Sequence, residues 1–295
     1  MGAADVVPGV SGGTIAFISG IYDELLSSIR AINLANIKRL FSGDISGAWR
    51  AVNGNFLVVL FAGILLSILS LAKLVNYGMQ EHPILVWSFF FGLIVASIIW
   101  MLTHLGCWRW QEGLAIVVGS AVAAGLFWMP GAVAGDSLII VFGAGALAIC
   151  AMILPGVSGS FILVLIGIYP ALIEAISEFN IPVLATFASG CLVGLLSFSR
   201  LLGWLLQNYR STTLGLLTGF LVGSLAIVWP WKEKLVVMFT ASGKEVVLEQ
   251  QNLMPTAYYD LFGDNPQTLA AIGLAVLGVV LVLGLEQLGG RLKRA

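Results

Sequence analysis

A six-residue phrase that interrupts helices occurs twice in this chain. The first copy, Pro-Gly-Val-Ser-Gly-Gly, begins at Pro8, and the second copy, Pro-Gly-Val-Ser-Gly-Ser, begins at Pro155. Each copy is followed at the same distance by Gly-Ile-Tyr, at residues 20–22 and 167–169, so the offset is 147 residues throughout. Proline cannot donate a backbone hydrogen bond, and glycine permits dihedral angles closed to other residues. Both copies therefore predict a broken helix.

The composition predicts a membrane protein. The chain of 295 residues is 59% hydrophobic and 10% charged, with a mean hydropathy of +1.01, whereas a soluble domain has about 25% charged residues. This chain has too few charged residues to form the surface of a protein in water. We therefore expect an all-α polytopic membrane protein. A net charge of −1 argues against a nucleic-acid partner. Cys107, Cys150 and Cys191 have no metal-ligand spacing, and no nucleotide-binding Gly-x-x-x-x-Gly-Lys motif occurs, so we expect no metal and no cofactor.

Six apolar segments are candidate transmembrane helices, because a span needs about 20 mostly apolar residues. They cover residues 54–74, 83–104, 113–128, 183–207, 212–231 and 267–286. Two further apolar regions, 3–29 and 137–177, contain the repeated phrase and are predicted re-entrant hairpins. The more polar stretches 31–53 and 232–266 are predicted to be a cytoplasmic loop and an outer loop.

The similarity between the two halves continues beyond the phrase, at an offset of 127 residues. The matched pairs are Gly63 with Gly190, Ser70 with Ser197, Lys73 with Arg200, Gly92 with Gly219 and Ser97 with Ser224. The loop 31–53 accounts for the change in offset. We therefore expect two repeats in one membrane domain, 1–136 and 137–295, each a broken hairpin followed by three spans.

The distribution of Lys and Arg predicts the orientation of the repeats. If each broken segment leaves the membrane on the side it entered, three spans separate equivalent points and the repeats are inverted. This arrangement puts nine basic residues inside, and only three, Lys232, Lys234 and Lys244, outside. The inner residues are Arg30, Lys38, Arg39, Arg50, Arg109, Arg210, Arg291, Lys293 and Arg294. The positive-inside rule favours inversion, with the C-terminus in the cytoplasm.

The two breaks are the candidate binding site. Ser11 and Ser158 are placed to cap helices that restart near Thr14 and Phe161. A new helix N-terminus offers unpaired N–H groups and a positive dipole end, which suit a phosphate. The residues expected to hold it are Gly9, Val10, Ser11, Gly12, Gly13, Thr14, Gly156, Val157, Ser158, Gly159 and Ser160. The alternative is that the Pro-Gly kinks only shape the helix bundle.

Charged residues in or near the apolar segments are further candidates, because charge at membrane depth is costly. Arg200 and Lys73 occupy equivalent positions and could hold a phosphate; Lys73 could instead extend to the interface. The carboxylates that could couple transport to an ion are Asp5, Asp23, Glu24 and Glu174. Asp23 and Glu24 could equally be solvated at the interface. Asp5 matches Met152 in the second copy, so the two breaks differ in chemistry.

The sequence around both breaks resembles a bacterial and archaeal membrane family. The segments 5–14, Asp-Val-Val-Pro-Gly-Val-Ser-Gly-Gly-Thr, and 154–159, Leu-Pro-Gly-Val-Ser-Gly, resemble the paired motifs of the polyprenyl-phosphate transporters of the PopT type. The family, formerly catalogued as a domain of unknown function, usually carries some residues before the first motif. The resemblance implies return of undecaprenyl phosphate from the outer to the inner leaflet of the bacterial cytoplasmic membrane, for cell-envelope synthesis. It implies a lipid partner and coupling to the lipid gradient, H⁺ or Na⁺.

Two other functions fit the same residues. The first is secondary transport of a small soluble anion through the same site. The second is intramembrane hydrolysis, because Gly9-Val10-Ser11-Gly12-Gly13 matches a nucleophile pattern in which Ser11 would attack. Hydrolysis needs a base, and the two histidines, His82 and His104, lie at predicted helix ends.

Overall fold

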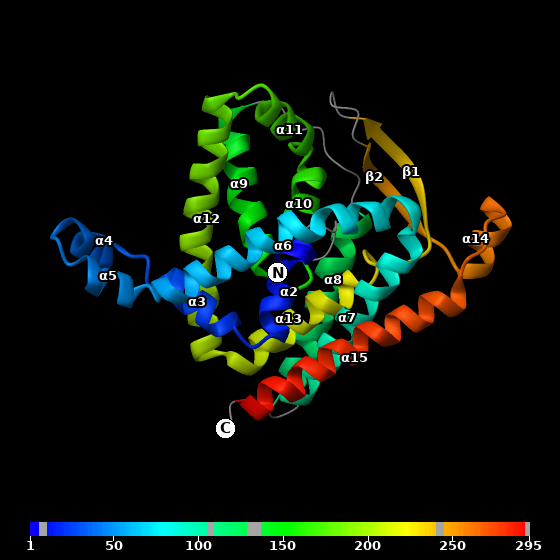
Figure 1. Cartoon of the computed structure of the whole chain (residues 1–295), viewed down its shortest axis with the longest axis horizontal. Coiled ribbons are helices and arrows are strands. Elements are labelled where there is room, and N and C mark those ends of the chain that lie inside the picture. Colours follow the sequence, from blue (N-terminus) through cyan, green and yellow to red (C-terminus); the bar gives the residue numbers. More distant parts are fainter. Residues whose placement is uncertain (6–10, 106–108, 129–136, 240–244, 293–295) are drawn as a thin grey trace.

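The computed structural model describes residues 1–5, 11–105, 109–128, 137–239 and 245–292. The first half contains α1 (Gly2–Asp5), α2 (Gly12–Ile18), α3 (Tyr22–Arg30), α4 (Leu34–Phe41), α5 (Ile45–Ala51), α6 (Gly54–Glu81), α7 (Pro83–His104) and α8 (Trp110–Trp128). The second half contains α9 (Leu138–Ile153), α10 (Gly159–Ile166), α11 (Tyr169–Ser177), α12 (Ile181–Asn208), α13 (Arg210–Ser224), β1 (Lys232–Phe239), β2 (Glu245–Asn252), α14 (Pro255–Phe262) and α15 (Thr268–Leu292). The helical fold predicted from composition is confirmed (Figure 1).

Apolar helices long enough to cross a bilayer are present. Among the described residues, three qualify by length and composition, at Gly54–Leu71, Pro83–Thr103 and Ile181–Asn208. The pair α10 and α11 qualifies together but is bent by 105°, as in a broken span or a re-entrant loop. The predicted spans 113–128 and 267–286 fall in shorter apolar helices. The predicted span 212–231 is wrong at its end, because α13 stops at Ser224.

The two halves repeat in backbone geometry. Helices α6 and α12 have 28 residues each and begin 127 residues apart. The turns that follow them match: His82 has φ −138° and ψ 55°, and Tyr209 has φ −134° and ψ 45°. Gly20 and Gly167, at the other offset, have φ of 72° and 82°. The turns after α6 and α12 and the two matched glycines therefore adopt the same local conformation, whereas the residues before α6 and α12 differ: Asn53 has φ 52° and Asn180 has φ −69°.

Close packing between the halves depends on glycine. Helix α7 packs on α15, and α13 packs on α8. A Cβ at Gly92 would overlap the Ala275 carbonyl group, and a Cβ at the matched Gly219 would overlap the Ile116 carbonyl oxygen. Each half thus contributes a glycine-bearing helix that contacts the last long helix of the other half, as small residues permit in membrane bundles.

Replacing Gly92 with Ala is expected to push α7 away from α15. Overpacking of this kind costs about 1–3 kcal/mol of the free energy of unfolding. Thermal unfolding in detergent measures the loss. Gly125→Ala on α8 is the matched control, because a Cβ there meets no atom within 4 Å. Equal midpoints for the two variants would contradict the packing role of Gly92.

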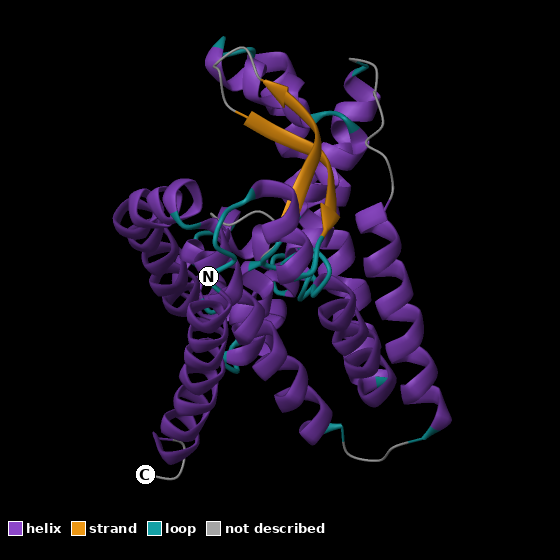
Figure 2. Cartoon of the chain, turned by 90° about the vertical axis from the view of Figure 1, so that its right-hand side faces the viewer, coloured by secondary structure: helices purple, strands orange, loops and turns teal. Residues whose placement is uncertain are grey.

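Both stretches predicted as loops contain regular structure. Residues 31–53 form the short helices α4 and α5, and residues 232–266 form the antiparallel hairpin of β1 and β2 followed by α14. Composition did not indicate the hairpin, whose two strands are drawn in orange in the upper half of Figure 2. Lys232 is the first residue of β1 and holds the start of the hairpin against the helices. Its Nζ donates to the Ile227 carbonyl and lies 3.4 Å from the centroid of the Trp87 ring. Burial lowers the pKa of this amine well below its usual range.

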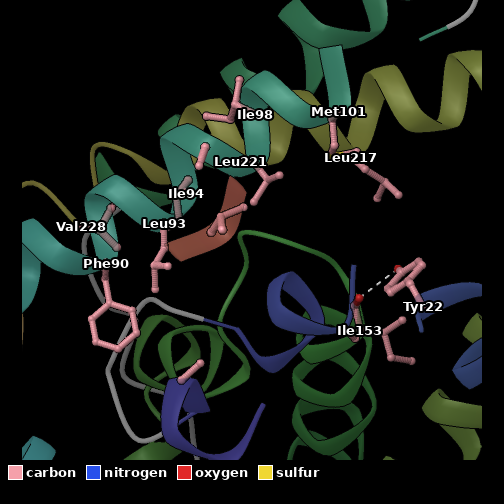
Figure 3. Packing of buried hydrophobic residues seen from close by; sticks show 14 of the residues in the cluster. Tyr22, Phe90, Leu93, Ile94, Ile98, Met101, Ile153, Leu217, Leu221 and Val228 are labelled. Carbon is pink, nitrogen blue, oxygen red and sulfur yellow. Dashed lines mark hydrogen bonds between the residues drawn. The ribbon is translucent and has the colours of Figure 1, made fainter. Parts of the chain in front are cut away.

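A buried apolar cluster joins the broken segments to the helices. It contains Tyr22 of α3, Ile94 and Met101 of α7, Ile153 of α9, and Leu217 of α13, all at most 8% exposed. Figure 3 shows Tyr22 pointing to Ile153 beside these side chains. The cluster therefore holds the first broken segment against the second.

Candidate binding site at the two helix breaks

The first break ends in a fully capped helix. Helix α2 begins at Gly12, two residues before the predicted restart at Thr14. The Ser11 hydroxyl accepts a hydrogen bond from the Gly13 N–H at 3.1 Å, so the predicted cap by Ser11 is confirmed. Asp5 Oδ1 accepts from the Gly12 N–H at 2.6 Å, and the Thr14 N–H donates to the Ser11 carbonyl oxygen. Gly9 and Val10 lie outside the described residues.

The second break turns sharply under α13. Helix α9 ends at Ile153, and the chain passes through Pro155 and Gly156 before α10 begins at Gly159. Gly156 has φ +84°, and a Cβ there would be 2.9 Å from the Phe220 carbonyl oxygen. Both the dihedral angle and the close approach require glycine at this position.

The second restart is uncapped, which distinguishes it from the first. Ser158 holds the N-cap position of α10, but the prediction that its side chain caps the helix is wrong. Its hydroxyl pairs instead with the Ser160 hydroxyl at 2.9 Å. The N–H groups of Gly159, Ser160 and Phe161 have no hydrogen-bond partner among the described residues. This end of α10 therefore offers donors and a positive dipole.

Asp5 and Met152 occupy the same place in the two breaks. A Cβ atom added to Gly12 would lie 2.8 Å from Oδ1 of the Asp5 carboxylate. A Cβ atom added to Gly159 would lie 2.6 Å from Cγ of Met152. The sequence match between the two residues is therefore also a match in space. In the first break a carboxylate covers the helix N-terminus, and in the second a neutral thioether side chain lies beside it.

Among the described residues, three hydrogen bonds join the two broken segments. The Ser11 hydroxyl donates to the Met152 carbonyl at 2.9 Å, and the Tyr22 hydroxyl donates to the Ile153 carbonyl at 3.0 Å, drawn as the dashed line in Figure 3. The Thr14 hydroxyl oxygen accepts from the Gly156 N–H at 3.0 Å. Residues that lie 131 to 142 positions apart in the sequence thus satisfy one another's free backbone groups. Sequence analysis did not single out Tyr22 as a site residue, although the repeated Gly-Ile-Tyr contains it.

The predicted cations are exposed on the long helices α12 and α6. Arg200 is exposed on α12, where Nη2 donates to the Ile32 carbonyl at 3.4 Å. Lys73 is exposed on α6. Neither makes a hydrogen bond or ion pair to a break within the described part of the chain. The structure therefore brings together the two phrases but not the two cations.

Of the four carboxylates, one belongs to a break. Asp23 pairs with Arg210 at 3.0 Å, and both side chains are exposed. Glu24 accepts a hydrogen bond from the Asn53 side-chain amide at 2.7 Å. Glu174 is exposed on α11. Asp5 alone among these four contacts a helix N-terminus at a break.

The surroundings of Ser11 differ from those of a nucleophile. Ser11 is 1% exposed, and its hydroxyl is shared between the Gly13 N–H and the Met152 carbonyl. His82 is exposed at the turn between α6 and α7, and the side chain of His104 lies outside the described groups. Among the described residues, no group of three His, Cys, Asp or Glu side chains could hold a metal ion.

Comparison with known proteins places the chain in a family. Residues 1–246 match the family model described as undecaprenyl phosphate translocase-like. The chain belongs to this family. A Vibrio cholerae protein named polyprenyl-phosphate transporter is 48% identical over 97% of this chain and 93% of its own length.

A more distant relative carries the same name. The polyprenyl-phosphate transporter of Staphylococcus aureus is 33% identical over 82% of this chain and 87% of its own length. No solved structure matches the chain. The family resemblance inferred from the two motifs is confirmed, and the chain is a multi-pass membrane protein of a transporter family.

Proposed function

We propose that this chain moves polyprenyl phosphate from one leaflet of the bacterial cytoplasmic membrane to the other and so recycles undecaprenyl phosphate for cell-envelope synthesis. Family membership and the names of both relatives support a polyprenyl-phosphate substrate. The substrate combines an anionic head with a long apolar tail. A carrier for it needs a polar site at membrane depth that opens toward lipid.

The uncapped end of α10 is the observation that carries this proposal. A phosphate has three strong acceptor oxygens, and the free N–H groups of Gly159, Ser160 and Phe161 with the Ser158 and Ser160 hydroxyls match them. The described part of the first break, residues 11–14, forms the opposite wall, because Ser11 and Thr14 form hydrogen bonds with the second break. The isoprenoid tail stays in lipid alongside the exposed surfaces of the long helices.

We also propose that the two halves are inverted repeats, 1–136 and 137–295, with the C-terminus in the cytoplasm. The matched geometry of α6 with α12 and the crossed packing of α7 on α15 and α13 on α8 support a two-fold relation. Alternating access would then expose the breaks to each leaflet in turn.

Asp5 is the first candidate for the carboxylate that couples transport to H⁺ or Na⁺. Asp23, Glu24 and Glu174 rank after it. Asp5 covers a helix N-terminus at the break, so its protonation would change the charge beside the substrate. Asp23 and Glu24 hold surface partners instead. Arg200 and Lys73 would contact the phosphate before or after it reaches the breaks, since they occupy matched positions on α12 and α6.

Replacing Arg200 with Ala is expected to lower polyprenyl-phosphate transport in proteoliposomes at least tenfold, because a guanidinium binds phosphate with two hydrogen bonds. Folding should be preserved, since the side chain is exposed and its hydrogen bond to the Ile32 carbonyl is long at 3.4 Å. Arg200→Lys keeps the charge and should retain part of the rate. Full transport by the alanine variant would remove Arg200 from the route, and transport of free inorganic phosphate by the wild type would favour a small-anion carrier.

A further inference from the structure

We propose that α4 and α5 form an amphipathic anchor that lies in the surface of the bilayer and binds anionic phospholipid headgroups. The two short helices project from one side of the helical body (Figure 1). They pack on each other, and α5 packs on the start of α6. This role is separate from the transport of the lipid substrate and holds whatever that substrate is.

Large apolar side chains are exposed on both helices. No residue of α4 is buried; Phe41 is 85% exposed and Leu34 is 76% exposed. The exposed apolar side chains are Leu34, Ile37, Leu40, Phe41, Ile45 and Trp49. On α4 they recur at spacings of three and four residues and so share one face, while Lys38 and Arg39 lie on the rest of the helix surface. Such a face in water would be anomalous, and it suits the boundary between headgroups and acyl chains.

The position of the two helices fixes which surface they meet. The Trp49 Nε1–H donates to Asn55 Oδ1 at 2.9 Å, and its ring lies against Gly54. The apolar span of α6 begins at Gly54. Only Val52 and Asn53 separate the end of α5 from this residue, so the anchor lies close to the start of the apolar span. Trp49 has the amphipathic ring typical of such interfaces.

The charge of the segment selects the lipid. Residues 31–53 carry Lys38, Arg39 and Arg50 but one acid, Asp44. Asp44 caps α5 by accepting from the Gly47 N–H. The three cations have no ion pair among the described residues. Each basic residue near an anionic membrane surface strengthens binding by about fivefold, so phosphatidylglycerol-type headgroups are favoured over neutral ones.

The test measures depth in the bilayer with the full chain. Phe41→Cys, in a background with Cys107, Cys150 and Cys191 replaced by Ala, is labelled with an environment-sensitive dye and reconstituted in lipid nanodiscs. We expect blue-shifted emission and quenching by lipid-attached nitroxide, since such helices insert about 5–10 Å. Ser46→Cys, on an exposed polar position of α5, is the matched control and should be quenched by aqueous iodide instead.

Two outcomes overturn the proposal. Quenching of the Phe41 label by iodide alone would place the helix in water. Protection from both quenchers would mean that protein, such as a second copy of the chain, covers it.

The headgroup preference is tested with Lys38→Gln/Arg39→Gln in nanodiscs with and without phosphatidylglycerol. The wild-type background should insert more deeply with the anionic lipid, and the double variant should lose that difference; an unchanged difference would refute the headgroup contact.

Discussion

Replacing Met152 with Asp is expected to abolish polyprenyl-phosphate transport. Met152 holds the place beside the α10 N-terminus that Asp5 holds beside α2. A carboxylate there would accept from the free N–H groups that we assign to the phosphate. Two like charges about 4 Å apart repel by about 4 kcal/mol at an effective dielectric constant near 20, so we expect at least about a 100-fold loss. Transport of a fluorescent polyprenyl phosphate in proteoliposomes measures it.

The control for this variant is Met152→Asn, which has the same shape as the aspartate without the charge. It should keep most of the transport rate, and both variants should fold, because the equivalent Asp5 is accommodated at the first break. If the Asn and Asp variants transport equally well, the phosphate does not bind at the α10 N-terminus. If both lose transport equally, the loss reflects packing and not charge.

Replacing Thr14 with Val is expected to remove one of the hydrogen bonds that join the two breaks. Thr14 is 1% exposed, and its hydroxyl oxygen accepts from the Gly156 N–H at 3.0 Å. Valine preserves the shape but leaves a buried N–H without a partner, which costs about 1–3 kcal/mol. We expect a lower unfolding midpoint in detergent and slower transport, because Gly156 is part of the proposed phosphate site.

Thr218→Val on α13 is the matched control for Thr14. Its side chain is equally buried, but its hydroxyl donates to the Leu214 carbonyl within the same helix. Its loss leaves no backbone group without a partner, so stability and transport should change little. Equal effects of the two substitutions would show that the hydrogen bond between the breaks has no special role.

The composition and the lengths of the apolar segments predicted a helical membrane fold. The predicted segment 83–104 matches α7 at both ends, because an uninterrupted apolar run ends at Pro83 and His104. The β-hairpin was missed because its two strands lie in a polar stretch whose pairing is set by contacts such as Lys232 with Trp87. Such contacts between distant segments leave no local pattern in a sequence.

Some of the geometry of the candidate site was predicted from the sequence. The duplicated phrase identified both breaks, and the mismatch of Asp5 with Met152 identified their chemical difference. The two copies of the phrase differ at their last residue, Gly13 and Ser160. The sequence did not indicate that the Ser160 hydroxyl would pair with the Ser158 hydroxyl in place of a cap. The joining role of Tyr22 depends on the packing of α3 against the end of α9, and it needed the structure.

The most direct test of the account is translocation of polyprenyl phosphate by the purified chain. Proteoliposomes carrying fluorescent polyprenyl phosphate are exposed to a membrane-impermeant quencher, with and without a pH or Na⁺ gradient. We expect wild-type protein to make the inner-leaflet pool of fluorescent lipid accessible to the quencher much faster than in empty liposomes. Met152→Asn should do the same, and Met152→Asp should not. Wild-type rates equal to those of empty liposomes under every gradient would contradict the account.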